Sequence, residues 1–91
     1  MVIKPLAEAV DLAVASDVGA ASIVSVINTN NTAIRLLVAE TTAATVWVAA
    51  GERVSIEKTP AVVISADDGA TPTPAAVTAA TVFATKIAYG N

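Results

Sequence analysis

The chain has 91 residues, 55% of them hydrophobic but only 3% aromatic, with a formal net charge of −3. This length indicates one domain, 1–91, since chains usually divide only well beyond this size. The five basic residues are scattered, whereas nucleic-acid binding needs a clustered basic face, so we expect no nucleic-acid partner. No apolar run approaches the roughly 20 residues of a membrane-spanning helix, so no membrane partner is expected either.

The apolar residues are mostly small or branched aliphatic side chains, and the mean hydropathy is +0.70. A domain this short buries only about two-thirds of the surface of its unfolded chain. It therefore has more apolar surface than a lone domain easily hides. We expect the remaining apolar surface to be buried in contacts between protein subunits.

The N-terminal segment leaves two structures open. In residues 6–15, Leu6, Val10 and Val14 fit helical spacing, whereas Val10, Leu12 and Val14 fit strand spacing. We expect an extended segment or a short helix, and residues 1–20 could form an N-terminal arm.

The rest of the chain shows mostly the alternating pattern of strands. The clearest case is 52–58, where Val54 and Ile56 point inward while Arg53, Ser55 and Glu57 point outward. The same reasoning predicts strands over residues 22–28, 33–39, 45–49, 52–58, 61–66 and 82–89. Strands 22–28 and 61–66 are apolar on both faces.

Turn-forming residues separate these strands. The Asn-rich stretch 28–32 predicts a tight hairpin turn, because Asn tolerates left-handed backbone angles and bonds its own main chain. Breaks are also expected at 50–52, 59–60 and 67–69, followed by a stiff extended connector at 71–74. Residues 74–80 could form one helical turn. The predicted fold is mainly β: a small antiparallel β-sandwich or barrel of about six to eight strands.

The sequence has little catalytic potential. It contains neither His nor Cys, which removes the commonest general base, metal ligand and nucleophile. Asp67-Asp68-Gly69 could donate oxygens to Ca²⁺, but the following residues break the pattern of a calcium loop, so we interpret it as a turn. We expect no enzyme activity, no cofactor and no metal.

Two further features of the sequence each allow two interpretations. Trp47, the only Trp, is predicted to be a core or interface anchor, with a sugar-stacking platform as the alternative. The charged residues Arg53, Glu57 and Lys58 are expected on one strand face. That face is either a solvated surface that discourages edge-to-edge aggregation or the rim of a subunit contact.

Several loose motifs resemble a known group of proteins. They are MVIKPL at 1–6, VINTN at 26–30, GERVSIEKTP at 51–60 and ATKIAY at 84–89. Together the motifs resemble small virion structural proteins of tailed phages, especially marine cyanophages. The chain departs from that group in its N-terminal third, where residues 6–15 are richer in Ala and acidic residues. The resemblance implies a β-rich virion component present in many copies.

The resulting expectation is a phage virion structural protein, a capsid decoration or cement protein that forms homo-oligomers on the head surface. Its partners would be itself and the major capsid protein, in a virion assembled in the cytoplasm of the bacterial host. A tail, fibre or appendage subunit is the alternative within this class. A small carbohydrate-binding β-module using Trp47 and Tyr89 is the alternative from another class. The residues expected to take part in assembly are Val2, Ile3, Leu6, Trp47, Phe83, Ile87 and Tyr89. An extended N-terminal arm could pair with a neighbour's sheet edge.

Overall fold

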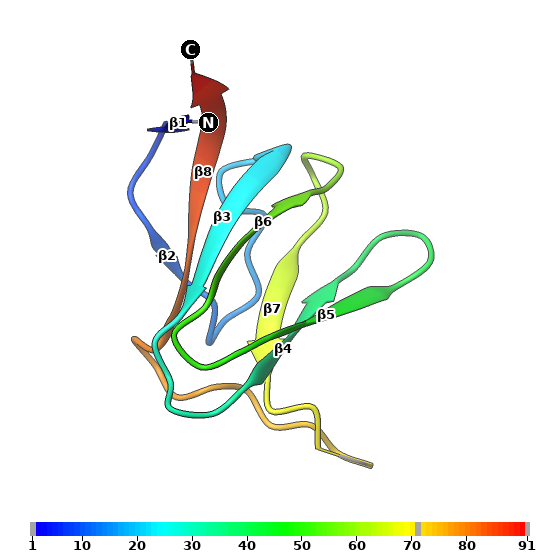
Figure 1. Cartoon of the computed structure of the whole chain (residues 1–91). Helices are drawn as coiled ribbons and strands as arrows, with labels where there is room; N and C mark the ends of the chain where they lie inside the picture. The colour runs from blue at the N-terminus through cyan, green and yellow to red at the C-terminus, as the bar shows by residue number, and fades with distance from the viewer. Residues whose placement is uncertain (1, 71, 91) are drawn as a thin grey trace.

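The computed structural model describes the backbone of residues 2–70 and 72–90, and the side chains of 4–70 and 72–88. The described chain contains eight strands and no helix (Figure 1). The strands are β1 (Val2–Pro5), β2 (Val10–Asp11), β3 (Ile23–Asn28), β4 (Ile34–Val38), β5 (Ala44–Val48), β6 (Arg53–Glu57), β7 (Ile64–Asp67) and β8 (Val82–Gly90).

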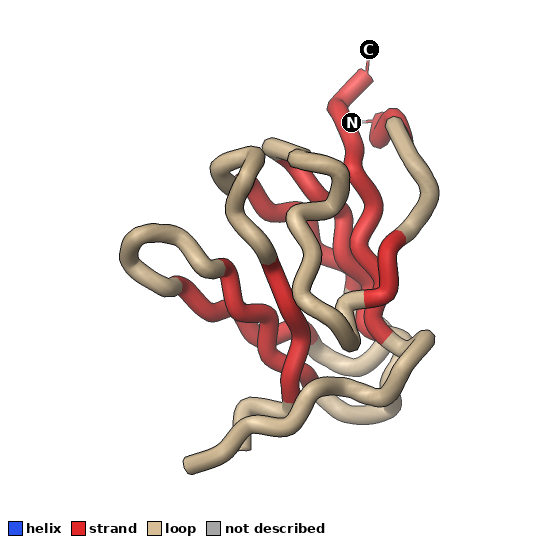
Figure 2. The backbone as a smooth tube through the Cα atoms, turned by 180° about the vertical axis from the view of Figure 1, so that it is seen from behind, coloured by secondary structure: helices blue, strands red, loops and turns tan. Residues whose placement is uncertain are grey.

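These strands form two antiparallel sheets. The large sheet has the order β1-β8-β3-β6, with β2 also paired to β8, and the small sheet has the order β5-β4-β7. Seen from behind, the two sheets lie as separate layers linked by long loops (Figure 2). The mainly β prediction is confirmed. The sheets are not closed into a barrel, so the sandwich alternative describes the fold.

The core lies between the two sheets and follows the alternation of the strands. In β4, Ile34, Leu36 and Val38 are buried while the residues between them are half-buried. Leu36 pairs with Val46 on one side and Ala66 on the other, so inward-facing positions of the small sheet are in register. The remaining members of the core cluster are Leu12, Val18, Ala21, Val24, Val26, Val48, Ile64, Val82 and Ala84.

Of the two structures predicted for the N-terminal segment, the extended one describes β1 and β2, and residues 2–20 contain no helix. β1 and β2 both pair antiparallel with β8, so these two strands belong to the chain's own large sheet and do not form a free arm. Leu12 and Val18 are both in the core, at 0% and 1% exposure. The apolar residues of this segment therefore belong to a stretch of chain that folds back onto the large sheet. Its strands are too short to be recognised from the local spacing of apolar residues.

Three consecutive residues between β2 and β3 adopt left-handed backbone angles. Val18, Gly19 and Ala20 have φ of 54°, 65° and 54°, and the Ala21 amide closes the turn on the Asp17 carbonyl at 3.3 Å. A β-branched residue is a genuine outlier in this region. We attribute its presence to the core, because this backbone places the Val18 side chain there.

The stretch 28–32 is not the predicted hairpin turn, because β3 and β4 belong to different sheets. No Asn is among the described residues with positive φ. Instead the buried Asn28 side chain holds the crossing: its Oδ1 accepts from the Asn30 amide at 2.9 Å. Its Nδ2 donates to carbonyls of Thr32, Val48 and Ala49 at 2.9, 3.1 and 3.2 Å. The predicted bonding of Asn to nearby main chain is thus present, in a crossover between sheets.

One side of the sandwich is closed and the other is open. On the closed side, Ser16 exchanges two backbone bonds with Ile64, and the Ala66 amide donates to the Leu12 carbonyl. On the open side, β5 and β6 each pair with a single strand. β7 begins at 64, later than the predicted 61, because the Val62 amide bonds back to Thr59 in a turn.

Residues 74–80, predicted to form one helical turn, contain no helix. Ala76 instead makes an isolated antiparallel bridge with Asp67. Residue 71 of the predicted connector 71–74 lies outside the described residues. Residues 72–74 contain no strand or helix.

Candidate functional site

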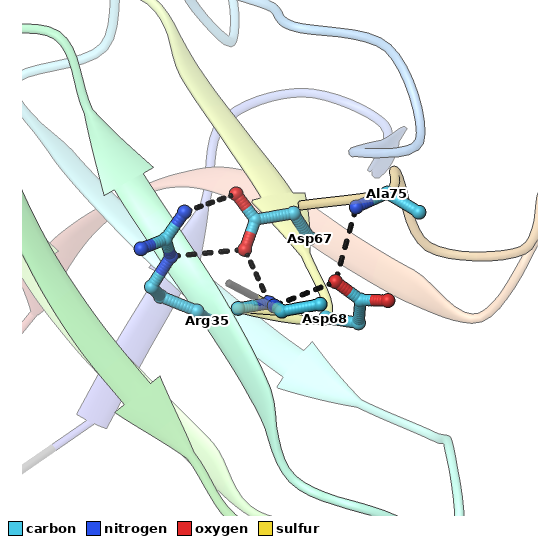
Figure 3. Close-up of polar contacts among 6 residues, drawn as sticks. Arg35, Asp67, Asp68 and Ala75 are labelled. Atoms are coloured by element: carbon cyan, nitrogen blue, oxygen red, sulfur yellow. Dashed lines mark hydrogen bonds and ion pairs between the residues drawn. The ribbon is translucent and has the colours of Figure 1, made fainter. Parts of the chain in front are cut away.

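The outer face of the small sheet carries a row of polar and aromatic side chains. Trp47 on β5 and Asp67 on β7 both lie opposite Arg35 on β4. The Arg35 guanidinium donates from Nε to Oδ1 and from Nη2 to Oδ2 of Asp67, both at 2.9 Å (Figure 3). This bidentate pair joins β4 to β7 on their outer face.

The two acidic residues that could have bound calcium are already engaged. Asp67 Oδ1 also accepts from the Gly69 amide at 2.8 Å. Asp68 Oδ1 accepts from the amides of Ala70 and Ala75, at 2.9 and 3.0 Å (Figure 3). Within residues 2–70 and 72–90, no group of three or more His, Cys, Asp or Glu gathers in a way that could hold a metal. The carboxylates thus act as local braces of the turn.

The surroundings of Arg35 and Asp68 on this face stabilise the charged form of each side chain. The Asp67 carboxylate raises the pKa of the Arg35 guanidinium above its usual value. The amides of Ala70 and Ala75 lower the pKa of the Asp68 carboxyl, because they bond its charged form. Neither group is a proton donor or acceptor suited to acid–base chemistry at neutral pH.

Trp47 is exposed, so of the two predicted roles, core or interface anchor, the core role is wrong and the interface role stays a prediction. Its exposed fraction is 56%, whereas Val48, the next residue, is fully buried. Residue size suggested burial, but the alternation of β5 places Trp47 on the outer face. The indole reaches across the sheet to Gly69, where an added Cβ would overlap the ring. Gly69 is thus required both by this close approach and by its φ of 66°.

A shallow depression of about 220 Å³ adjoins this region. Its lining comes from the turn after β3 and from the chain before β8: Asn30, Thr32, Ala33, Ile34, Asp68, Ala76, Val77 and Thr78. The only charged side chain there is Asp68, whose Oδ1 already accepts two amide hydrogens. The depression therefore offers one charged group, a carboxylate with one of its two oxygens already bonded.

The outer face of the large sheet carries several apolar residues on its two central strands, β3 and β8. Because Val24, Val26 and Asn28 point into the core, the alternate residues Ile23, Ser25 and Ile27 point outward. On β8 the outward positions are Phe83, Thr85 and Ile87, with Phe83 directly opposite Ile27. We call Ile23, Ile27, Phe83 and Ile87 the outer apolar face.

This outer apolar face contains two of the predicted assembly residues. Phe83 is half-buried, and Ile87 is 4% exposed yet outside the core cluster. Ser25, between Ile23 and Ile27, is 1% exposed and accepts a 2.8 Å bond from Arg53 Nη1. Ile23 and Ile27 were not singled out from the sequence, although the doubly apolar pattern of 22–28 contained the signal.

The other predicted assembly residues lie near the paired chain ends. The backbone of Ile3 pairs with Tyr89 and that of Val2 with Gly90. The side chains of Val2, Ile3 and Tyr89 lie outside the described residues. Leu6 follows β1, is 47% exposed, and its amide donates to the Lys86 carbonyl at 2.9 Å. Trp47, by contrast, belongs to the other sheet, so the structure does not gather the predicted residues into one site.

The predicted charged strand face is only partly correct. Arg53 and Glu57 are exposed on β6, but Lys58 is 5% exposed and has the opposite parity. Its amine donates to the Pro60 carbonyl at 2.9 Å. Burial lowers the pKa of this amine below its usual value. Lys58 thus helps to close the turn after β6.

The fold defines the chain as a small two-sheet antiparallel β-sandwich with open edges on one side. Comparison of the chain with family models, with curated proteins and with solved structures finds no match. None of the described residues forms a helix long and apolar enough to cross a membrane.

Proposed function

We propose that the chain is a phage virion structural protein, a capsid decoration protein that assembles with copies of itself on the head surface. The observation that supports this proposal is the outer apolar face. An antiparallel sheet with one face on the core usually presents polar residues to solvent on the other. Here Ile23, Ile27 and Phe83 point away from the core on adjacent central strands. Outward apolar residues of this kind, interrupted by the polar Ser25–Thr85 pair, are typical of contacts between proteins.

The composition suits a protein that makes many repeated contacts. Ala loses essentially no side-chain entropy on ordering, whereas Lys or Glu loses up to about 2 kcal/mol. A surface of small and branched side chains is therefore inexpensive to order against a neighbour. Individually weak contacts gain strength when they are repeated in a symmetric shell. A tail, fibre or appendage subunit would need the same surface properties and is the alternative within this class.

The test is solution mass by light scattering over a dilution series of the purified chain. We expect the wild type to form a defined oligomer that Ile27→Thr and Phe83→Thr weaken. Val14→Thr is the matched control, because Val14 is 74% exposed on a different part of the surface. Open-ended growth into filaments favours the tail or appendage alternative. A folded monomer at every concentration contradicts self-assembly.

A second candidate is a carbohydrate-binding module, favoured by the exposed Trp47 beside the Arg35–Asp67 pair. Aromatic rings that are apolar and accessible can stack against other flat apolar surfaces. Tyr89, the second aromatic predicted for such a module, is on the large sheet while Trp47 is on the small one. Calorimetric titration of glycans into the wild type and Trp47→Ala decides the question. Absence of binding by both folded proteins excludes this candidate.

A further inference from the structure

We infer that β6 pairs with β6 of a second copy of this chain, antiparallel and across a two-fold axis at Ser55. This inference deepens the proposed function, because it names one surface through which the copies would associate. It is drawn from the hydrogen-bonding pattern of β6 and from the order of the charges along it.

Half of the backbone groups of β6 are bonded to β3. β6 pairs only with β3, in a register that places Val54 opposite Val26 and Ile56 opposite Val24. Just beyond the two ends, the Asn28 amide donates to the Glu52 carbonyl and the Lys58 amide to the Ser22 carbonyl. Antiparallel bonding alternates along a strand, so the groups of Val54 and Ile56 also point to β3.

The same alternation directs three residues to the open edge. The N–H and C=O groups of Arg53, Ser55 and Glu57 point away from β3. They form a short ladder without a strand partner in the described structure. An edge of this kind is a template for strand pairing unless it is covered or disrupted.

The open edge of β6 is complementary to itself. With the two-fold axis at Ser55, each Ser55 faces its own copy in a hydrogen-bonded pair. Arg53 of one chain then faces Glu57 of the other, twice, again as hydrogen-bonded pairs. All outward groups of the three residues would be paired, and opposite charges would lie directly across the new strand pair on the outer face, where such pairs are stabilising.

The inner face of the pairing would be apolar. Val54 and Ile56 pack on the edge of the core but remain half-buried, and they would lie opposite Ile56 and Val54 of the second copy. On the facing small sheet, Val46 points inward and is still 36% exposed. Figure 1 shows the β4–β5 hairpin diverging from β6 on this side. The core is therefore incomplete along the edge that the second copy would cover.

The other edges offer less. The outer edge of β7 already bonds to Leu12 and Ser16. β1 contains Pro5, which has no amide hydrogen to give. On β5 the outward groups belong to Thr45 and Trp47, whose side chains give no charge complementarity. β6 alone combines free backbone groups with a charge order that specifies a second copy.

The decisive experiment mixes two variants. Arg53→Glu makes both outward charges negative, and Glu57→Arg makes both positive, so each variant alone places like charges opposite each other. We expect each to raise the dimer dissociation constant roughly tenfold to a hundredfold, because two pairs change sign per dimer. An equimolar mixture restores both opposite-charge pairs. Light scattering should therefore show dimers in the mixture at concentrations where each variant alone is monomeric.

A second variant tests the backbone ladder. Ser55→Pro removes an outward amide hydrogen that β3 does not use, and Pro is tolerated on edge strands. It should abolish the association while far-UV circular dichroism shows a folded chain. The wild-type dimer should also weaken as salt is raised, because exposed charge pairs are screened.

The outcomes separate this inference from the proposed function. A mixture that stays monomeric, or single variants that associate like the wild type, overturns pairing through β6. If the wild type assembles and only Ile27→Thr or Phe83→Thr weakens it, the proposed function stands and the β6 inference fails. If the wild type is monomeric up to about 1 mM, both fail.

Discussion

Replacing Asn28 by Ala should reveal how much of the stability depends on one buried amide. Asn28 is 0% exposed at the end of β3, where the chain crosses from the large to the small sheet. Its side chain bonds four backbone groups, on Asn30, Thr32, Val48 and Ala49. It therefore connects the end of β5 to the turn that begins β4.

The magnitude follows from those bonds. A typical intramolecular hydrogen bond contributes about 0.5–1.5 kcal/mol net, and a buried carbonyl left without a donor costs about 1–3 kcal/mol. Of these bonds, the one to the Val48 carbonyl is buried. This carbonyl is therefore the group for which the loss of its donor should cost most. The expected loss in the free energy of unfolding is about 3–4 kcal/mol. This is a large fraction of the 5–15 kcal/mol typical of a domain.

Urea denaturation followed by far-UV circular dichroism is the appropriate assay, because the exposed Trp47 is a poor reporter of core burial. Asn31→Ala is the matched control. Asn31 lies in the same turn and is exposed, and no hydrogen bond of its side chain is present among the described residues, so a change within about 0.5 kcal/mol is expected. A loss below about 1 kcal/mol for Asn28→Ala, or equal losses for both variants, would refute the role given to this amide.

Three further predictions concern a glycine at positive φ and two titrating groups. Gly69→Ala should lower the free energy of unfolding by about 1–3 kcal/mol, because φ is 66° and the new Cβ overlaps Trp47; adding Trp47→Ala should recover part of the loss in the same urea assay. The pKa of Lys58 is lowered by burial, so the folded state binds fewer protons than the unfolded state between that lowered value and 10.5. Stability should therefore rise with pH through this window, and a Lys58→Met variant should lack the rise; an equal rise in both would refute it. The pKa of Asp11 is lowered from 3.8 by the amides of Ala13 and Ala80, so its contribution is present above 3.8 and lost as pH falls through the folded value. Acid titration of Asp11→Asn should show a shallower loss of stability than the wild type, and parallel curves would contradict this.

The fold was predicted correctly from the sequence where the local alternation of apolar and polar residues matches their burial in the structure. β6 was located correctly because Val54 and Ile56 meet the core while Arg53 and Glu57 meet solvent. β1 and β2 were missed as strands, because both are short and depend on pairing with β8, more than 70 residues away in the register.

The errors at individual residues have physical causes. Trp47 was predicted to be a core or interface anchor because of its size, and the parity of β5 excludes the core alternative by placing the ring on the outer face. Lys58 was predicted to share a strand face with its charged neighbours. Instead, its amine donates to the backbone carbonyl of Pro60 in the turn after β6.

Only some residues of the candidate surfaces could be predicted from the sequence. Phe83 and Ile87 were identified, and Ile23 and Ile27 were implied by a strand apolar on both faces. Arg35 and Asp67 are 32 positions apart in the chain, and only the pairing of β4 with β7 brings them together. No local pattern contains such a juxtaposition.

The pairing of β1 with β8 has a mechanical consequence. Val2 lies opposite Gly90, so the two ends of the described chain leave the fold side by side at one pole (Figure 1). Tension applied between these two points would load the β1–β8 ladder at its outermost bond first. The bonds would break one after another, as in a zipper, and would not resist together as in shear. This pole should yield at low force, while β3, held between β8 and β6, keeps its partners on both sides.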